Sequence, residues 1–332
     1  MGKLPNKELK ALLNCIKKDS RVIIPPMVGY DSGVHLLDGK YLAVASDPCT
    51  GIPEEWFGWL LINYAASDLA LSGAKPEFCT INLLGPRSTE PTTFQKIMKQ
   101  TCKAANELNI AIVRGHTGTY DSLSDLLGVA TVYGSVQPEK LLTSGNAKPG
   151  DLIVCTKPLG LETIINFSII QKVLAQKIFG AAQQEKFSKQ VRMQSCVKEA
   201  MQLAKINGVH AMHDATEGGF VAALNELAEA SKVGFMVDWE KIPVSKEALA
   251  LQSHFGLTDE QLLSVSSTGT ILAAVDAQAE EKVKENLAEN GLSACILGEF
   301  TKSKKRILIK HREQTLFPLA ANDPYASMLS PK

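Results

Sequence analysis

Three short apolar runs and one long apolar run dominate the first half of the chain. The short runs are typical of strands and cover residues 41–46, 110–113 and 128–134. The long run, Trp56–Ser72, has the length of a helix and is apolar on nearly every face, which predicts a buried helix. It ends at Gly73, a residue typical of the C-terminal end of a helix. The first two strands end on polar or glycine residues, at Asp47-Pro48 and at Arg114-Gly115.

The second half of the chain mixes helices and strands without a repeat. A strand over residues 151–156 follows the turn Lys148-Pro149-Gly150, and two helical stretches come next, through about Phe179 and over roughly 185–207. An amphipathic helix begins directly after Gly218-Gly219. The remaining pattern predicts a strand, a charged helix and two short strands, over residues 270–275, 278–289, 294–300 and 306–309. These elements together predict an α+β fold.

The length of the chain indicates two domains. With 332 residues, of which 45% are hydrophobic, the chain can bury one large core or two ordinary ones, and the usual domain size favours two. The turn at Gly150 is the best candidate for a boundary. We therefore expect an N-terminal domain over residues 1–149 and a C-terminal domain over residues 150–332.

The charge balance excludes partners that require a strong electrostatic field. The chain has 35 Lys plus Arg residues and 35 Asp plus Glu residues, so no nucleic acid or membrane partner is expected. A small-molecule substrate is expected instead. No run approaches ~20 apolar residues and the N-terminus is polar, which predicts a cytoplasmic protein. The seven cysteines are scattered without a Cys-x-x-Cys pair, so neither a disulfide framework nor a structural zinc site is expected.

Three aspartates in the first half suit a hard cation. Asp31 lies in a glycine-containing turn, Asp47 follows Ser46 at the end of a strand, and Asp68 lies in the apolar helix. Mg²⁺ takes oxygen ligands, usually a few carboxylates with phosphates and water. Asp68 is the strongest candidate because an ionised carboxylate on an apolar helix is costly unless it is paired or bound to a metal. The alternatives are a structural hydrogen bond for Asp68 and ordinary turn positions for the other two.

The segment His213–Gly219, with the sequence HDATEGG, places two carboxylates, a hydroxyl and two glycines at the start of a helix. Exposed amides and the positive end of the helix dipole favour phosphate there, and Asp214 and Glu217 suit the accompanying cation. An N-cap with an acidic first turn is the alternative. His210 and His213 lack a third metal ligand, and we expect His210 to be structural.

Lys157 is a candidate phosphate contact because it follows a strand and precedes Pro158-Leu159-Gly160. A solvated lysine is the alternative. The chain has no Walker Gly-Lys-Ser/Thr loop, and no Gly-x-Gly-x-x-Gly follows a strand, which disfavours P-loop and Rossmann folds.

A series of motifs, in one order along the chain, resembles a known superfamily. The series is GYDSGV (29–34), SDP (46–48), NYAASDLALSGA (63–74), KP (75–76), GHT (115–117), KPGD (148–151), TKPLG (156–160), HDATEGG (213–219) and LNE (224–226). It resembles the superfamily of aminoimidazole-ribonucleotide synthetase, thiamine-monophosphate kinase, selenophosphate synthetase and the hydrogenase-maturation carbamoyl dehydratase, and is most similar to the last branch. The resemblance covers about residues 25–300.

The resemblance implies a two-domain α+β subunit whose N-terminal domains pair in a homodimer, with ATP and Mg²⁺ bound between residues of both halves. It implies metal ligands at Asp31, Ser46, Asp47, Asp68 and Asp214. It implies nucleotide contacts at Asp31, Gly115, His116, Thr117, Lys157, Thr216 and Gly218. It implies catalytic roles for Lys157, Asp214 and Glu217.

The reaction that the resemblance implies is transfer of the ATP γ-phosphoryl group to an amide or carbonyl oxygen of a small or carrier-bound substrate. Oxygen then leaves as phosphate, which prepares dehydration or ring closure. One alternative is a small-molecule kinase similar to thiamine-monophosphate kinase. Another is an inactive nucleotide-binding dimer that serves in maturation or regulation. A maturation partner protein is a further candidate partner.

Several positions depart from the family pattern. Tyr30 replaces an acid of many members, His116 replaces an Asp of the kinase branch, and Glu217 replaces an Arg common in the dehydratase branch. The dehydratase carries its substrate on a C-terminal cysteine, whereas this chain ends ASMLSPK, so that reaction is not expected in the same form. The reactive Cys and glycine-rich loop of selenophosphate synthetase are also missing before Gly29, which disfavours selenium chemistry.

Overall fold

The computed structural model describes residue 4 and residues 6–330, so the last two residues of the cysteine-free ending lie outside the described part. The chain forms two compact units. The N-terminal unit comprises Ile16–Met27 and Asp31–Leu141. The C-terminal unit begins its main segment at Leu142, ahead of the boundary expected at 149/150, and also includes Val28–Tyr30 and the described part of the first fifteen residues.

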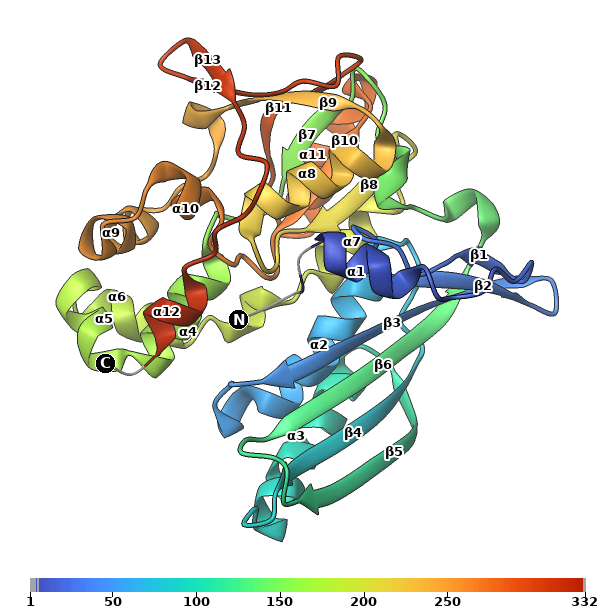
Figure 1. The fold of residues 1–332 in the computed structure, drawn as a ribbon, viewed down its shortest axis with the longest axis vertical. Coiled ribbons are helices and arrows are strands. Elements are labelled where there is room, and N and C mark those ends of the chain that lie inside the picture. The colour runs from blue at the N-terminus through green and yellow to red at the C-terminus, as the bar shows by residue number, and fades with distance from the viewer. Residues whose placement is uncertain (1–3, 5, 331–332) are drawn as a thin grey trace. The chain divides into compact units, whose positions relative to one another are not determined.

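The N-terminal unit is a six-stranded sheet with two long helices, α2 (Glu54–Leu71) and α3 (Pro91–Glu107) (Figure 1). Its strand order is β1-β2-β3-β6-β4-β5. The strands are β1 (Val22–Ile24), β2 (Gly33–Leu37), β3 (Lys40–Thr50), β4 (Phe78–Pro86), β5 (Ala111–Tyr120) and β6 (Leu127–Val136). Only β4 and β5 pair in parallel, as expected of strands joined by a crossover helix, here α3.

The two helices of this unit pack tightly on one another at Gly58. A β-carbon at Gly58 would clash with the Ile97 carbonyl oxygen and lie 2.7 Å from the Thr101 hydroxyl, so α2 approaches α3 only because this position has no side chain. The amide of Gly58 also donates to Gln100 Oε1 at 3.0 Å. Although α2 is apolar on all sides, no helix among the described residues is long and apolar enough to cross a membrane.

The sheet of the N-terminal unit has one covered and one open face. Cys79, Ile81 and Leu83 of β4 are at most 3% exposed, whereas the residues that alternate with them are half-buried or exposed. Phe78 is 42% exposed and stacks on Tyr133 of β6 with ring centroids 5.5 Å apart. We call the side of the sheet that carries Phe78, Tyr133 and their neighbours the open face.

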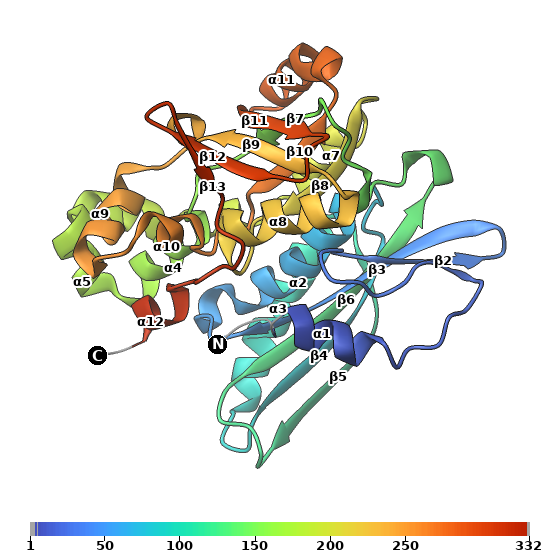
Figure 2. The same ribbon diagram turned by 45° about the horizontal axis from the view of Figure 1, so that its top comes forward.

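The C-terminal unit is built on a seven-stranded sheet of order β13-β12-β9-β11-β7-β10-β8 (Figure 2). The strands are β7 (Leu152–Cys155), β8 (Val209–Asp214), β9 (Gly234–Asp238), β10 (Ile271–Val275), β11 (Cys295–Thr301), β12 (Arg306–Lys310) and β13 (Glu313–Leu316). The buried strand β10 is apolar throughout and pairs with β7 and β8.

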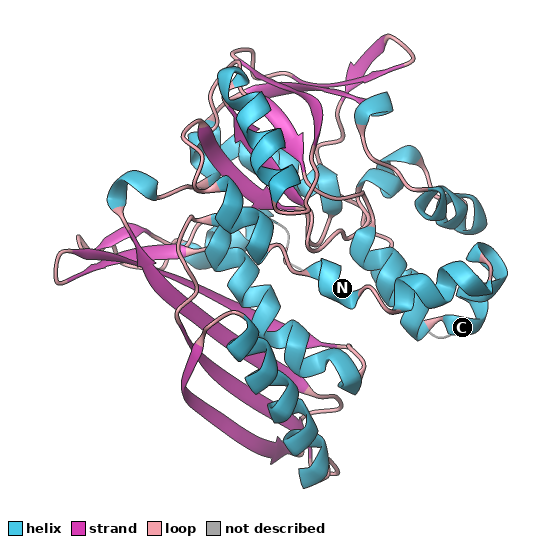
Figure 3. Ribbon diagram, turned by 180° about the vertical axis from the view of Figure 1, so that it is seen from behind, coloured by secondary structure: helices cyan, strands magenta, loops and turns pink. Residues whose placement is uncertain are grey.

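Helices and short 3₁₀ turns surround this second sheet (Figure 3). The α-helices are α1 (Asn6–Leu13), α4 (Leu161–Ile170), α5 (Lys172–Phe179), α6 (Ala181–Ser188), α7 (Val197–Leu203), α8 (Gly219–Ser231), α9 (Lys246–Phe255), α10 (Asp259–Leu263), α11 (Glu280–Glu289) and α12 (Tyr325–Leu329). Helix α1 is tied to α8 by an exposed ion pair between Lys10 and Glu229 at 2.6 Å.

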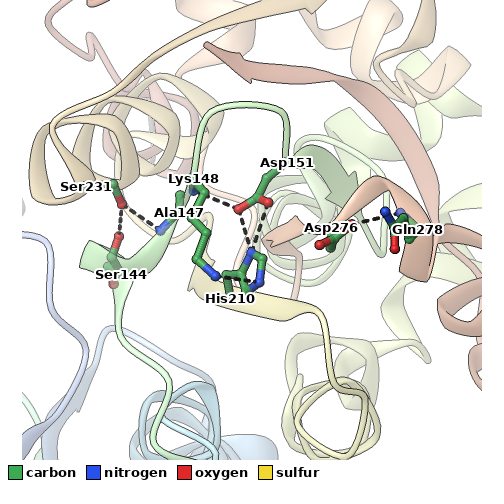
Figure 4. Close-up of polar contacts among 8 residues, drawn as sticks. All are labelled: Ser144, Ala147, Lys148, Asp151, His210, Ser231, Asp276 and Gln278. Atoms are coloured by element: carbon green, nitrogen blue, oxygen red, sulfur yellow. Dashed lines mark hydrogen bonds and ion pairs between the residues drawn. The ribbon is translucent and has the colours of Figure 1, made fainter. Parts of the chain in front are cut away.

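The chain enters the C-terminal unit earlier than expected because the segment before the Lys148-Pro149-Gly150 turn is bonded to α8. Ser231 of α8 donates through its hydroxyl to the Ser144 carbonyl oxygen at 2.9 Å and accepts from the Ala147 amide at 3.0 Å (Figure 4). Residues 142–147 therefore belong to the C-terminal unit, although their sequence carries no strong pattern.

Most predicted elements are confirmed, and two kinds of error stand out. The strands expected at 41–46 and 110–113 are longer and continue to Thr50 and Tyr120. The single helix expected over 185–207 is wrong, since a 3₁₀ turn at Val191–Gln194 separates α6 from α7. Gln194, in this turn, is fully buried and donates to Asn166 Oδ1 at 2.9 Å.

Candidate functional site

Strand β3 of the N-terminal unit directs Asp47 to the side of the sheet that α2 covers. Ala43, Ala45 and Cys49, which lie at two-residue spacing from Asp47, are at most 3% exposed, and residues two apart share one face of a strand. The Cys49 thiol donates to the Phe57 carbonyl oxygen of α2 at 3.8 Å, which identifies this face as the helix side.

Asp68 lies on the stripe of α2 that faces the same side of the sheet. Phe57 and Leu61 are the nearest side chains to Gly128 of β6, and position 68 follows Leu61 by seven residues, or about two helical turns. Asp68 is half-buried among apolar neighbours. The prediction that Asp47 and Asp68 serve one site is thus compatible with the structure.

Asp31 lies two residues before β2, the strand that pairs with β3. Gly33, the first residue of β2, pairs with Val44 of β3. Asp47 and Asp68 thus share the helix side of the sheet, and carboxylate oxygens suit Mg²⁺. That Asp31 joins them stays a prediction.

Ser46 differs from its expected place in this cluster. Its hydroxyl lies 2.9 Å from the Thr131 hydroxyl of β6, on the open face and opposite to Asp47. Strand alternation is the reason, because adjacent residues of one strand point to opposite faces. The side chain of Ser46 is thus directed away from Asp47.

The Gly115-His116-Thr117 segment also differs from its expected place. It lies within β5, the edge strand, rather than in a glycine-rich loop. Three strand spacings separate β5 from β3, which corresponds to about 14 Å. His116 Nε2 lies 2.9 Å from the Tyr120 hydroxyl. Within its own unit, the segment therefore does not join Asp31, Asp47 and Asp68.

In the C-terminal unit, the HDATEGG segment forms the end of β8, a tight loop and the start of α8. Gly218 and Gly219 both have left-handed backbones, with φ of +81° and +55°. A β-carbon at Gly219 would lie 2.8 Å from the Leu263 carbonyl oxygen, so only glycine fits. Asp214 is 3% exposed, whereas Glu217 is exposed at the tip of the loop.

The two histidines of β8 do not form a metal pair. His210 Nδ1 lies 2.9 Å from both carboxylate oxygens of Asp151, and Lys148 Nζ lies 3.0 Å from His210 Nε2 (Figure 4). His213 instead lies 2.8 Å from Glu226 Oε2 through its Nε2. Three residues apart on a strand, the two rings point to opposite faces. His210 is structural, as predicted.

The amide of Gly218, expected to bind a phosphate, already has an acceptor. It donates to Asp323 Oδ2 at 3.1 Å, and the same oxygen accepts from the Ser266 hydroxyl at 2.6 Å. Sequence patterns gave no signal for Asp323, because the segment before it is irregular and lacks periodicity. The helix start does attract an anion, but in this structure the anion is a side chain of the protein.

Lys157 differs from its predicted role in binding phosphate and in catalysis. Its ammonium group lies 2.8 Å from the Glu199 carboxylate, and it donates to the carbonyl oxygens of Met193 and Ser195 at 3.0 and 2.7 Å. An ammonium group has three donors, and these contacts use all three. The pair is almost fully buried, with 10% and 6% of the two side chains exposed. Lys157 therefore holds α7 and the preceding turn in place.

Glu162 of α4 is a buried acid that the sequence analysis missed, although it carries the same signal as Asp68, a carboxylate in an apolar helix. Burial raises the pKa of the Glu162 carboxyl to about 7. The hydrogen bond from Thr268 opposes this rise, and the negative charge of Asp323 adds to it. Glu162 is thus an acid that changes its charge near neutral pH.

Family models match both parts of the chain. The model described as AIR synthase related protein, N-terminal domain, matches residues 29–136. The model described as AIR synthase related protein, C-terminal domain, matches residues 148–311. The two matches together account for most of the chain and for both units described above.

Individual relatives are more distant. A putative hydrogenase expression/formation protein of Methanocaldococcus jannaschii is 28% identical over 260 residues, which cover 76% of this chain and 72% of that protein. A selenide, water dikinase of Myxococcus xanthus is 28% identical over 281 residues, 76% of each chain. The fold is similar to that in a HypE–HypF complex structure, with a TM-score of 0.73, 20% identity and coverage of 93% of this chain and 98% of that one.

We expect Lys157→Met to destabilise the protein by about 3–5 kcal/mol, because the substitution leaves Glu199 buried without its cation. The free energy of unfolding in urea measures this. The control is Lys189→Met, which removes an ion pair with 71% and 65% of its side chains exposed and is expected to cost at most about 0.5 kcal/mol. Unchanged stability of Lys157→Met, together with weaker ATP binding, would restore the phosphate role.

Glu162 should make stability depend on pH. Its pKa is 4.5 in the unfolded chain and about 7 when folded, so the folded state binds the extra proton and stability falls as pH rises between these values. The difference in unfolding free energy between Glu162→Gln and the parent should therefore grow by about 3 kcal/mol from pH 4.5 to pH 8. Urea titrations at both pH values test this, with the exposed Glu281→Gln as control. A difference that is constant with pH would contradict it.

Proposed function

The chain belongs to the AIR synthase related family, and we propose that it is an ATP-dependent enzyme that transfers the γ-phosphoryl group to an amide or carbonyl oxygen. The substrate is a small molecule or is attached to a carrier. The observation that carries this proposal is that Asp47 of β3 and Asp68 of α2 lie on the same, helix-covered side of the N-terminal sheet, in a chain without a P-loop or Rossmann motif.

The donor set supports a magnesium nucleotide. Carboxylate oxygens are the side-chain ligands that Mg²⁺ prefers, and a few of them with phosphate oxygens and water complete its shell. Of the predicted ligands, Asp47 and Asp68 face the same side of the sheet, Ser46 points to the opposite side, and Asp31 remains a proposed ligand. A bound Mg²⁺ would neutralise charge on the transferring phosphate and offset the mutual repulsion of the acids.

The chemistry in this proposal is balanced without a redox partner. The substrate oxygen attacks the γ-phosphorus, and the bond from that phosphorus to the β–γ bridging oxygen breaks, which releases ADP. The oxygen then leaves as inorganic phosphate, and an amide that also loses two protons from nitrogen becomes a nitrile. The loop of the C-terminal unit offers Asp214 and the exposed Glu217 as acceptors for those protons.

The dehydratase type of reaction is preferred over a simple kinase because of the relatives. The M. jannaschii relative is named as a putative hydrogenase expression/formation protein, and the HDATEGG and TKPLG segments resemble that branch. A selenide, water dikinase is equally similar in identity, but the reactive Cys and glycine-rich loop expected of that chemistry are missing before Gly29. A hydrogenase-maturation partner protein belongs to the same proposal.

We also propose that two copies of the chain pair through the open face of the N-terminal unit. Large apolar side chains seldom remain on a sheet surface without a partner. Phe78 and Tyr120 are 42% and 43% exposed, and β5 leaves the edge of the sheet available for pairing. A symmetric pair would bury the same residues of both copies.

Calorimetry of ATP binding tests the proposed site. The parent should bind ATP with Mg²⁺ and much more weakly without it. Asp47→Asn and Asp68→Asn should each weaken Mg²⁺-dependent binding by about tenfold or more, because each removes a charged ligand.

Asp125→Asn is the matched control, because it neutralises an exposed acid of the same unit and should leave binding unchanged. Absence of ATP binding in the parent and in every variant tested would favour the alternative of a scaffold that has lost its chemistry. A product that keeps the phosphoryl group would instead identify a kinase.

Phe78→Asp should convert the dimer to a monomer, because a charge at the centre of an apolar interface costs several kcal/mol per copy. Sedimentation velocity measures the change. Val173→Asp, at a 68% exposed position of α5 in the other unit, is the control and should leave the dimer intact. A parent that sediments as a monomer would contradict this pairing.

A further inference from the structure

The segment from Phe317 to Ser330 follows β13 and runs past the beginning of α8 to α12, which lies beside α4 (Figure 2). We call these residues the strap. Its carboxylate, Asp323, receives the Gly218 amide at 3.1 Å and the Ser266 hydroxyl at 2.6 Å. The Tyr325 amide donates to the other carboxylate oxygen at 2.9 Å, which orients Asp323 toward α8.

A carboxylate in this position resembles a bound phosphate. The start of a helix attracts anions through its unsatisfied amides and its dipole, and α8 has the length needed for a full dipole contribution. The Gly218 amide is the group that the sequence motif assigns to a nucleotide phosphate. A phosphate oxygen and the Asp323 carboxylate cannot both accept this hydrogen bond at the same point, because both are negatively charged.

The strap also covers the loop sterically. A β-carbon at Gly218 would lie 2.8 Å from Ala321 Cβ, so the strap backbone passes directly over this glycine. Gly218 is buried as a result. Access of any ligand to the Gly218 amide therefore requires the strap to move.

The strap is anchored at both ends, and its middle is exposed but bonded through Asp323 and through the Asn322 amide, which donates to the Ser264 hydroxyl at 3.2 Å. Phe317 and Met328 are each 2% exposed in the core of the unit. Further contacts join Asn225 Nδ2 to the Pro318 carbonyl oxygen at 2.8 Å and Asn166 Nδ2 to the Tyr325 hydroxyl at 2.7 Å. In contrast, Leu319 is 74% exposed. A segment of this kind can open in the middle or release α12 without unfolding the sheet.

The surroundings of Asp323 favour its displacement by a metal-bound phosphate. Glu162 and Glu217 lie close enough for their charges to interact, and the negative charge of Asp323 disfavours ionisation of Glu162. The charge of Asp323 is therefore unfavourable for its neighbour Glu162, whereas a nucleotide phosphate would arrive with its cation.

We propose that the strap is an autoinhibitory element. In it, Asp323 accepts the hydrogen bond of the Gly218 amide, so that ATP binds only when the strap is displaced. This proposal rests on the proposed function, because it assumes that the amide serves a nucleotide phosphate. The strap thus sets the apparent affinity for ATP, and a ligand or partner that holds α12 away from α4 activates the protein.

The test compares Asp323→Ala and Asp323→Asn with the parent, by calorimetry with ATP and Mg²⁺ on proteins that retain the parental circular dichroism. Asp323→Ala should bind ATP roughly ten- to a hundredfold more tightly, the range for loss of a competing charged hydrogen bond. Asp323→Asn, which keeps an acceptor without the charge, should fall between the two. Asp276→Ala is the matched control, since Asp276 accepts the Gln278 amide at 2.9 Å in a short helical turn away from Gly218 (Figure 4).

Hydrogen exchange provides a second readout. ATP should increase deuterium uptake of the peptide that contains Tyr325–Leu329 in the parent, because α12 is released. The strap proposal would be overturned if the parent and Asp323→Ala bound ATP equally. It would also be overturned if ATP bound and left α12 equally protected. In both cases the proposed function would stand. Failure of both proteins to bind ATP would overturn the proposed function, and the strap proposal with it. Binding by Asp323→Ala alone would support both.

Discussion

The connection between β8 and α8 depends on two consecutive left-handed glycines, and the C-terminal part of the candidate site follows from it. A side chain at Gly219 would clash with the backbone of the segment that follows α10, so the turn can close only without one. The closure buries Asp214 at the end of β8 and leaves Glu217 exposed. The Gly218 amide, at the start of α8, donates to Asp323. One backbone constraint therefore fixes both a candidate anion site and its present occupant.

Charged groups in apolar surroundings appear at several points of this protein, and their partners decide their roles. Lys157 and Glu199 satisfy each other, with two carbonyl oxygens completing the shell of the ammonium group, so this pair stabilises the fold. Burial, together with the charges of neighbouring acids, raises the pKa of the Glu162 carboxyl although Thr268 donates a hydrogen bond to it, so Glu162 retains its proton to higher pH. Asp47 and Asp68 lie on one side of the N-terminal sheet, where we propose that they bind a cation.

The two units contribute differently to the proposed chemistry. The N-terminal unit offers a rigid set of carboxylates, held by a strand and by a helix that packs on its neighbour through Gly58. The C-terminal unit offers a loop whose amide is covered by a segment with an exposed middle. A metal site needs fixed ligands, whereas a regulated site needs an element with two states of similar free energy. In our proposals, the N-terminal carboxylates are the fixed part and the strap is the part that opens.

The sequence by itself determined the elements whose pattern is local. The apolar run at Trp56–Ser72, the helix after Gly218-Gly219 and the order of the family motifs are all readable from neighbouring residues. Only the tertiary structure decided which polar groups meet. Strand alternation turned Ser46 away from Asp47, sheet order placed His116 at an edge strand, and Glu199 took Lys157 as its partner. The physical reason is that periodicity reports burial and local geometry. A hydrogen bond such as the one from the Gly218 amide to Asp323 joins residues far apart in the chain and follows from packing.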